Sequence, residues 1–138
     1  MDKASTSKIV LMSIHPSFVN AIMSGTKKVE FRKTKFASEV SDVVVYATSP
    51  MKQVVCTFEV KKIIIDSPDS LWLSYSSIAG VCREKFFAYY KSSTYGVAIE
   101  VGQLRKLKRY LFLPELGHKI NPPQSYQYLD RKVFEQLV

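Results

Sequence analysis

Hydrophobic residues along the chain form short runs and alternations that predict a β-rich fold. A short apolar run bounded by turn residues is typical of a buried strand, and alternation of apolar with polar residues is typical of a strand buried on one face. We therefore expect strands at Ile9–Ile14, residues 28–32, Asp42–Ala47, Gln53–Ile65, Tyr95–Val101 and Leu107–Leu113.

The segment Gln53–Ile65 has a period-two pattern that predicts which side chains lie on each of its two faces. The pattern predicts four residues that point into the core and four that point outward, respectively Val54, Cys56, Phe58 and Val60, and Val55, Thr57, Glu59 and Lys61. A strand of this length is expected to bend or bulge, and the consecutive Lys61 and Lys62 mark the place. In contrast, Asp42–Ala47 is apolar at nearly every position and is expected to be buried on both faces.

Four segments have the spacing and end signals of helices. Pro16 suits the first turn of a helix and Gly25 its C-terminal end. Ser67-Pro68-Asp69 combines a capping serine, a proline and an acidic residue before a short helix. We expect two further helices, at Arg83–Lys91 and Asp130–Leu137.

The order of these elements predicts the fold class. Regular alternation of strands and helices is absent, so we expect an α+β fold with a small mixed or antiparallel sheet, curved or closed into a barrel and flanked by helices. The 138 residues match the size of one domain. We therefore expect a single domain over residues 1–138.

The charge balance points to a polyanionic partner. Twenty Lys and Arg against twelve Asp and Glu give a formal net charge of +8, which suits a protein that binds nucleic acid. An acidic protein partner is the alternative. No apolar run approaches the roughly 20 residues that span a bilayer, and the N-terminal residues lack the pattern of a secretory signal. We expect no membrane association, a cytoplasmic protein, and reduced Cys56 and Cys82.

Motifs for metals and cofactors are missing from the sequence. The two histidines, His15 and His118, are far apart, and no paired-cysteine spacing is present, so we expect no metal site. The five glycines never form a phosphate-binding or dinucleotide-binding loop. We expect a function that needs no cofactor.

The segment Ser24–Lys33, SGTKKVEFRK, carries the clearest candidate site. Lys27 supplies a mobile cation, and Arg32 supplies a planar fork that suits phosphate or the edge of a base. Glu30 is expected to stay ionised between them and to accept hydrogen bonds. The alternation of these residues with apolar ones also fits a half-buried strand whose polar face is a solvated ladder. Composition alone favours this second interpretation.

The spacing Gly25-x-Lys27-x-x-Glu30-x-Arg32 resembles the GxKxxExR motif of ASCH domains, which belong to the PUA-like superfamily. Other segments agree with that family in the same order. SIHPSFVNAIMSG resembles the strand and helix before the motif, VVVYATSP and VVCTFEV resemble two central strands, and YGVAIEV resembles a later strand. PPQSYQYL is similar to the ending of a subgroup described as predicted transcriptional regulators. The resemblance covers residues 9 to about 129.

The resemblance implies a small PUA-like β-barrel with a cleft that, in related domains, holds an RNA or DNA nucleotide, often one with a modified base. It places three residues in the cleft and four at its rim, respectively Lys27, Glu30 and Arg32, and Ser49, Pro50, Gln124 and Ser125. The partner expected on this basis is RNA, single-stranded DNA, or a nucleotide or modified base. The protein is then a reader or regulator.

Enzymes within the family offer an alternative. One branch consists of amidohydrolases that act on acetylated cytidine through the motif lysine, a threonine three residues later and a distant glutamate. Here Lys27 matches, Glu30 stands in place of the threonine, and Glu84 is the glutamate of the corresponding region. Another branch is linked to ribonuclease activity, in which Lys27 and Glu30 are the candidate catalytic residues and Arg32 stabilises the phosphate.

Overall fold

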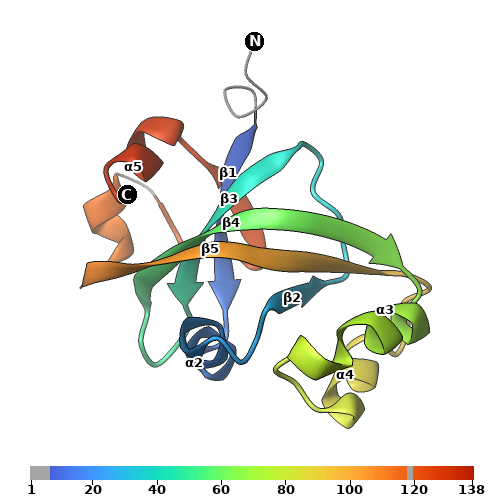
Figure 1. Cartoon of the computed structure of the whole chain (residues 1–138). Coiled ribbons are helices and arrows are strands. Elements are labelled where there is room, and N and C mark those ends of the chain that lie inside the picture. The colour runs from blue at the N-terminus through green and yellow to red at the C-terminus, as the bar shows by residue number, and fades with distance from the viewer. Residues whose placement is uncertain (1–6, 118–119) are drawn as a thin grey trace.

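The protein is built around one six-stranded sheet (Figure 1). The computed structural model describes residues 7–117 and 120–138. The strands are β1 (Lys8–Ile14), β2 (Val29–Arg32), β3 (Val40–Ala47), β4 (Gln53–Asp66), β5 (Gly96–Leu111) and β6 (Tyr126–Leu129). The helices are α2 (Pro16–Ser24), α3 (Pro68–Tyr75), α4 (Arg83–Tyr89) and α5 (Arg131–Glu135), with the 3-10 turns η1 (Ser76–Ile78) and η2 (Leu113–Leu116).

The sheet is mixed and strongly curved. Its strand order is β2-β5-β4-β3-β1-β6, and β1 pairs in parallel with β3 while the other pairs are antiparallel. In Figure 1 the long strands β4 and β5 cross the direction of β1 and β3, as expected of a sheet with a large twist. Within the described residues the edge strands β2 and β6 do not pair with each other, so the barrel stays open. The expected α+β fold is confirmed.

Three hydrophobic cores hold the helices against the sheet. One core joins α2 to β1, β3, β4 and β5. A second lies on the other side of β1 and β3, where η2 and α5 pack. The third joins β2 and β5 to α3 and α4. The α3–α4 pair is therefore attached to the end of the sheet formed by β2 and β5.

The outward assignment of Val55 and Thr57 on β4 is wrong. These residues are 0% and 2% exposed, because hydrophobic cores cover both faces of the sheet at this part of β4. Lys61 lies beyond this cover and is exposed, as predicted. The register of β4 against β5 shifts between Val60 and Lys62, which confirms the predicted irregularity there.

The prediction of two separate strands at Tyr95–Val101 and Leu107–Leu113 is also wrong, because residues 96–111 form one continuous strand. Gly102 lies at the middle of this strand. A Cβ atom there would lie 2.9 Å from the carbonyl oxygen of Glu59 on β4, so a glycine lets the two strands approach closely as they curve. The basic run that follows Gly102 is the exposed end of the same strand.

The predicted helix ends of α2 and α3 are confirmed. Gly25 ends α2 in the left-handed conformation, with a φ of 86°. The Ser67 hydroxyl accepts a hydrogen bond from the backbone N–H of Ser70 at 3.2 Å and so caps α3. Both signals are local, and they fix how the chain enters and leaves the sheet.

The two cysteines are free thiols, Cys56 buried and Cys82 exposed. Burial raises the pKa of Cys56 to about 12, which keeps it protonated and unreactive at neutral pH. In the part of the chain that the structure describes, no helix combines the length and apolar character needed to cross a bilayer. His118 lies outside the described residues.

Candidate functional site

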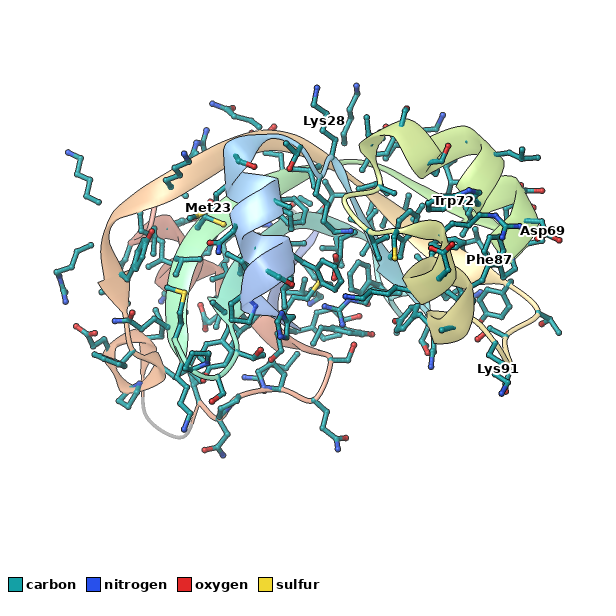
Figure 2. The ribbon with its side chains drawn as sticks, turned by 90° about the horizontal axis from the view of Figure 1, so that it is seen from below. Met23, Lys28, Asp69, Trp72, Phe87 and Lys91 are labelled. Carbon is teal, nitrogen blue, oxygen red and sulfur yellow. The ribbon has the colours of Figure 1, made fainter. Side chains whose placement is uncertain are left out.

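The segment that follows α2 forms the polar wall of a cavity. After Gly25 the backbone N–H groups of Thr26 and Lys27 donate to the carbonyl oxygen of Ala21, which turns the chain back toward the sheet. β2 then pairs with β5. Seen from below, α2 lies on one side of this region and the α3–α4 pair on the other (Figure 2). The segment is therefore enclosed by helices on both sides.

Lys27 is a buried lysine with an exposed fraction of 2%. Its Nζ donates a hydrogen bond to the carbonyl oxygen of Ala79 at 2.6 Å and lies 3.8 Å from Oε1 of Glu30. The ring centroids of Phe18 and Phe31 lie 4.9 and 5.2 Å from the same nitrogen. A carbonyl, a carboxylate and two ring faces thus replace water around the ammonium group.

Gly80 makes room for the Lys27 side chain. Its φ is +65°, and a Cβ atom at this position would lie 2.4 Å from Cβ of Lys27. Both the backbone conformation and the close approach require a glycine. The connection between η1 and α4 therefore holds Lys27 in two ways: Gly80 packs against its side chain, and the carbonyl oxygen of Ala79 accepts a hydrogen bond from its Nζ.

The pKa of Lys27 lies below its ordinary value of 10.5. Burial is the main cause, because it penalises the charged form. The carboxylate of Glu30 acts in the opposite direction, and the guanidinium of Arg32 adds to the lowering. A buried amine with a lowered pKa can release its proton more readily than a surface lysine, which is a property that active sites use.

Glu30 lies between Lys27 and Arg32 and is itself buried. Its Oε2 is 3.1 Å from Nη2 of Arg32, and its side chain is 8% exposed. The interpretation of this face as a solvated ladder is therefore wrong. The predicted half-buried pattern is not observed, since Val29, Glu30 and Phe31 are all buried; Phe18 of α2 and Tyr89 of α4 line the same cavity as Glu30.

Arg32 connects β2 to two distant segments. Its Nη2 donates to the carbonyl oxygen of Ser13 at 2.7 Å, and Nη1 donates to the Ser125 hydroxyl at 3.4 Å. The backbone of Arg32 is held by the Tyr90 hydroxyl, which donates to its carbonyl oxygen at 2.8 Å. Its Nε is buried and has no hydrogen-bond partner among the described residues. A buried donor left unpaired is unfavourable by about 1–3 kcal/mol.

These three charged residues line a cavity of about 240 Å³. Its apolar wall consists of aromatic and aliphatic side chains, namely Ile14, Phe18, Phe31, Val81, Phe86 and Tyr89. Its polar wall consists of Ser13, His15, Lys27, Glu30, Arg32 and Lys85. Pockets for drug-sized ligands measure roughly 300–1,000 Å³, so this cavity suits a single ring system. The exposed members of the lining, His15, Lys85 and Tyr89, mark its mouth.

The four residues expected at the rim are distributed over two places. Ser49 and Pro50 are exposed in the turn between β3 and β4, and they are not part of the cavity lining. Gln124 is exposed and likewise outside the lining. Ser125 contacts the site through its hydrogen bond with Arg32. Of the four, the structure brings Ser125 directly to the charged residues.

His15 is a cavity residue that the sequence reasoning missed as part of this site. It is the N-cap of α2, where its Nδ1 accepts a hydrogen bond from the backbone N–H of Ser17 at 3.1 Å. An accepting Nδ1 belongs to the neutral ring that carries its proton on Nε2. The sequence did contain a signal, because His15 follows a strand and precedes the Pro16 that begins the helix of the motif.

Several charged residues near the motif lie outside the cavity. Lys28 is exposed, and Figure 2 shows it at the edge of the molecule. Glu84, the glutamate required for the amidohydrolase alternative, is exposed on α4 and is not in the lining. Over residues 7–117 and 120–138, no three His, Cys, Asp or Glu side chains gather as metal ligands would.

Comparison with known proteins identifies the family. The ASCH domain profile matches residues 12–106, which is most of the chain. The chain therefore belongs to the ASCH domain family. It is 27% identical over 134 residues to an ASCH domain-containing ribonuclease of Zymomonas mobilis subsp. mobilis, covering 95% of this chain and 90% of that protein. The crystal structure of ASCH from Zymomonas mobilis superposes with a TM-score of 0.86 at 27% identity, covering 94% of this chain and 93% of that one.

A second curated relative is much longer. Large ribosomal subunit protein uL22 of Ureaplasma parvum serovar 3 is 28% identical over 125 residues, which cover 90% of this chain. The chain spans 40% of the length of that protein. The similarity therefore concerns one part of it.

Proposed function

We propose that the protein binds single-stranded RNA and holds one nucleotide in the cavity beside Lys27, Glu30 and Arg32. The observation that carries this proposal is the convergence of an ammonium, a carboxylate and a guanidinium on one wall of a cavity with aromatic side chains on the other. Proteins read single-stranded RNA by stacking its bases on aromatic groups and by hydrogen bonds to the edges of the bases. The cavity offers both kinds of contact to one base, modified or unmodified.

The distribution of positive charge supports contacts with phosphates outside the cavity. The long strands β4 and β5 carry exposed basic residues, among them Lys61 and Lys62 on β4, and Lys106 and Lys108 on β5. With a net charge of +8, the protein attracts a polyanion. The similarity to an ASCH domain-containing ribonuclease favours RNA over single-stranded DNA, a free nucleotide or an acidic protein.

The adjacent lysines Lys27 and Lys28 allow a matched test of the cavity. Methionine at position 27 keeps a long apolar side chain in the buried position and removes the charge, whereas the same change at 28 removes an exposed charge. We expect Lys27→Met to weaken binding of a short single-stranded RNA by about tenfold or more, because a charged hydrogen bond is lost. Lys28→Met is expected to change binding by less than about threefold.

The measurement is fluorescence anisotropy of labelled RNA at two salt concentrations. The logarithm of the affinity should fall with the logarithm of the salt concentration with a slope of about −0.7 for each phosphate contacted. Equal effects of the two substitutions would show that the cavity does not bind the RNA. No binding of RNA at low salt, or binding of an acidic peptide alone, would refute the proposed function.

Cleavage of RNA is a second candidate function, favoured by the lowered pKa of Lys27 beside Glu30 and by the name of the Zymomonas relative. In this reaction a base takes the proton of the ribose 2′-hydroxyl, and the 2′-oxygen bonds to phosphorus. The bond from phosphorus to the 5′-oxygen breaks, and that oxygen receives a proton from the member of the Lys27–Glu30 pair that does not act as the base. Lys27 or Glu30 would serve as the base, and Arg32 would stabilise the charge that develops on the phosphate.

Cleavage is tested by incubating labelled single-stranded RNA with the purified protein. Activity that is lost in Lys27→Met and Glu30→Gln and kept in Lys28→Met supports the second candidate. If the RNA stays intact in the presence of saturating wild-type protein, cleavage is refuted and RNA binding is the remaining function. Activity that survives in both cavity variants would place any cleavage at another site.

A further inference from the structure

The polar wall of the cavity presents its hydrogen-bonding groups in a fixed order. Glu30 is in the middle, with Oε1 directed to Nζ of Lys27 at 3.8 Å and Oε2 directed to Nη2 of Arg32 at 3.1 Å. The side chains of Lys27, Glu30 and Arg32 are 2%, 8% and 14% exposed. A planar ligand whose edge meets this wall therefore finds a donor, an acceptor and a second donor, all with little access to water.

Each of the three groups has capacity left for a ligand. The ammonium of Lys27 has three N–H donors, and one is directed to the Ala79 carbonyl. A carboxylate accepts more than one hydrogen bond at each oxygen, so Glu30 can bind its neighbours and a ligand together. Arg32 has five N–H donors. Its Nη2 is engaged by Ser13 and Glu30, and its Nη1 donates one hydrogen to Ser125, so the second hydrogen of Nη1 is left for a ligand.

We propose that this order of groups selects uracil, an inference that rests on the proposed function. The pairing edge of uracil presents a carbonyl oxygen, the N3–H and a second carbonyl oxygen, that is, an acceptor, a donor and an acceptor. This is the complement of the row formed by Lys27, Glu30 and Arg32. The N3–H donates to the Glu30 carboxylate, and the two carbonyl oxygens accept from the cations on either side.

The other bases place a like group against this wall. Cytosine and adenine present an unprotonated ring nitrogen where Glu30 needs a donor. Guanine offers an N–H to Glu30, but its amino group then meets one of the two cations. A buried polar group that faces a like partner is costly, and sites built on hydrogen bonds reject analogues that lack the required group strongly.

The preference is measured with short single-stranded oligomers of each nucleotide under one salt condition. We expect the uridine oligomer to bind about tenfold or more tightly than the cytidine and adenosine oligomers, since one correctly paired base edge discriminates by about this factor. Oligomers of N3-methyluridine keep the ring and both carbonyl oxygens but lack the N3–H. They are expected to lose the advantage. A deoxyuridine oligomer has the same base and reports separately whether the sugar matters.

Glu30→Gln tests the same inference from the side of the protein, with the exposed Glu135→Gln as its matched control. A glutamine amide can turn to offer either a donor or an acceptor, so the ratio of uridine to cytidine affinity should fall to within about threefold. Glu135→Gln should leave the ratio unchanged. If Glu30→Gln does not fold, the N3-methyluridine comparison with the wild-type protein decides.

The outcomes separate this inference from the function on which it rests. Equal binding of all oligomers, tighter binding of another base, or full binding of the N3-methyluridine oligomer would overturn uracil selection and leave RNA binding in place. The absence of binding to every oligomer at low salt would overturn both.

Discussion

The carboxylate of Glu30 lies 3.1 Å from the guanidinium of Arg32, and both side chains are largely withdrawn from water. A second pair, Glu59 and Arg105, provides a contrast within the same sheet, because its atoms are 3.9 Å apart and its side chains are 49% and 44% exposed. Exposed ion pairs contribute little to stability. Removal of one partner of a buried pair leaves an uncompensated buried charge. The two pairs should therefore respond differently to mutation.

Glu30→Ala should lower the free energy of unfolding by about 3–5 kcal/mol, because Lys27 and Arg32 would be left as buried cations without a carboxylate. Glu59→Ala should change it by about 1 kcal/mol or less. Urea denaturation of both variants and the wild type measures the difference. Similar values for the two variants would show that the Glu30 site is hydrated in solution.

Lys27 should give the stability of the protein a specific dependence on pH. Burial lowers its pKa in the folded protein below the ordinary 10.5, so between these two values the unfolded chain binds more protons at this residue. Stability therefore rises with pH in this window. Below the folded pKa the penalty for the buried charge is fully present. Each unit of lowering corresponds to about 1.4 kcal/mol.

The variant Lys27→Met lacks this dependence. As the pH rises from neutrality toward 10.5, the difference in free energy of unfolding between the two proteins should shift in favour of the wild type. Denaturation series at several pH values test this, with Lys28→Met as the control. A difference that stays constant, or that moves in favour of the variant, would contradict the lowered pKa.

Gly80 and Gly25 separate backbone strain from steric conflict. Both have a positive φ, but a Cβ atom at Gly25 has nothing within 4 Å, whereas one at Gly80 would overlap the Lys27 side chain. Gly25→Ala should be destabilising by about 1–2 kcal/mol, and Gly80→Ala by more, since it adds overpacking of about 1–3 kcal/mol. Gly80→Ala should also weaken RNA binding. If it destabilised no more than Gly25→Ala, the η1–α4 connection would be free to move away from Lys27.

Tyr89 should contribute to RNA binding as an aromatic side chain at the cavity mouth. It is 40% exposed, lines the cavity and lies under the ammonium of Lys33, 4.7 Å from the ring centroid. Stacking of a base on an aromatic ring contributes about 1–3 kcal/mol, so Tyr89→Ala should weaken binding about fivefold to a hundredfold. Tyr110, which is 37% exposed on β5, supplies the control. A loss of affinity of the same size in Tyr110→Ala would show that the RNA does not bind specifically at the cavity.

The parts of the fold set by local chemistry were predictable from the sequence. Pro16 and Gly25 mark the two ends of α2 because a missing N–H and a left-handed φ are properties of single residues. Burial of Thr57 could not be predicted in this way. It depends on hydrophobic cores that pack against both faces of the sheet, whereas a period-two pattern describes a strand with one covered face.

The composition of the site was predictable from the sequence only in part. The three charged residues Lys27, Glu30 and Arg32 lie within one short segment. Their spacing in the sequence is therefore enough to predict that they lie close together. The cavity also needs His15 from the start of α2 and Tyr89 from α4. Tyr89 reaches the cavity because α4 packs against β2 through a core of aromatic side chains, and His15 reaches it because α2 packs against the sheet through a separate core; no short motif encodes either arrangement.

A crystal structure of the protein bound to a short single-stranded RNA would show directly whether the cavity holds a base. We expect one base inside the cavity, with its edge within hydrogen-bonding distance of the Glu30 carboxylate and its ring near Phe18 and Tyr89. RNA that lies across the exposed lysines of β4 and β5 and leaves the cavity empty would contradict this expectation.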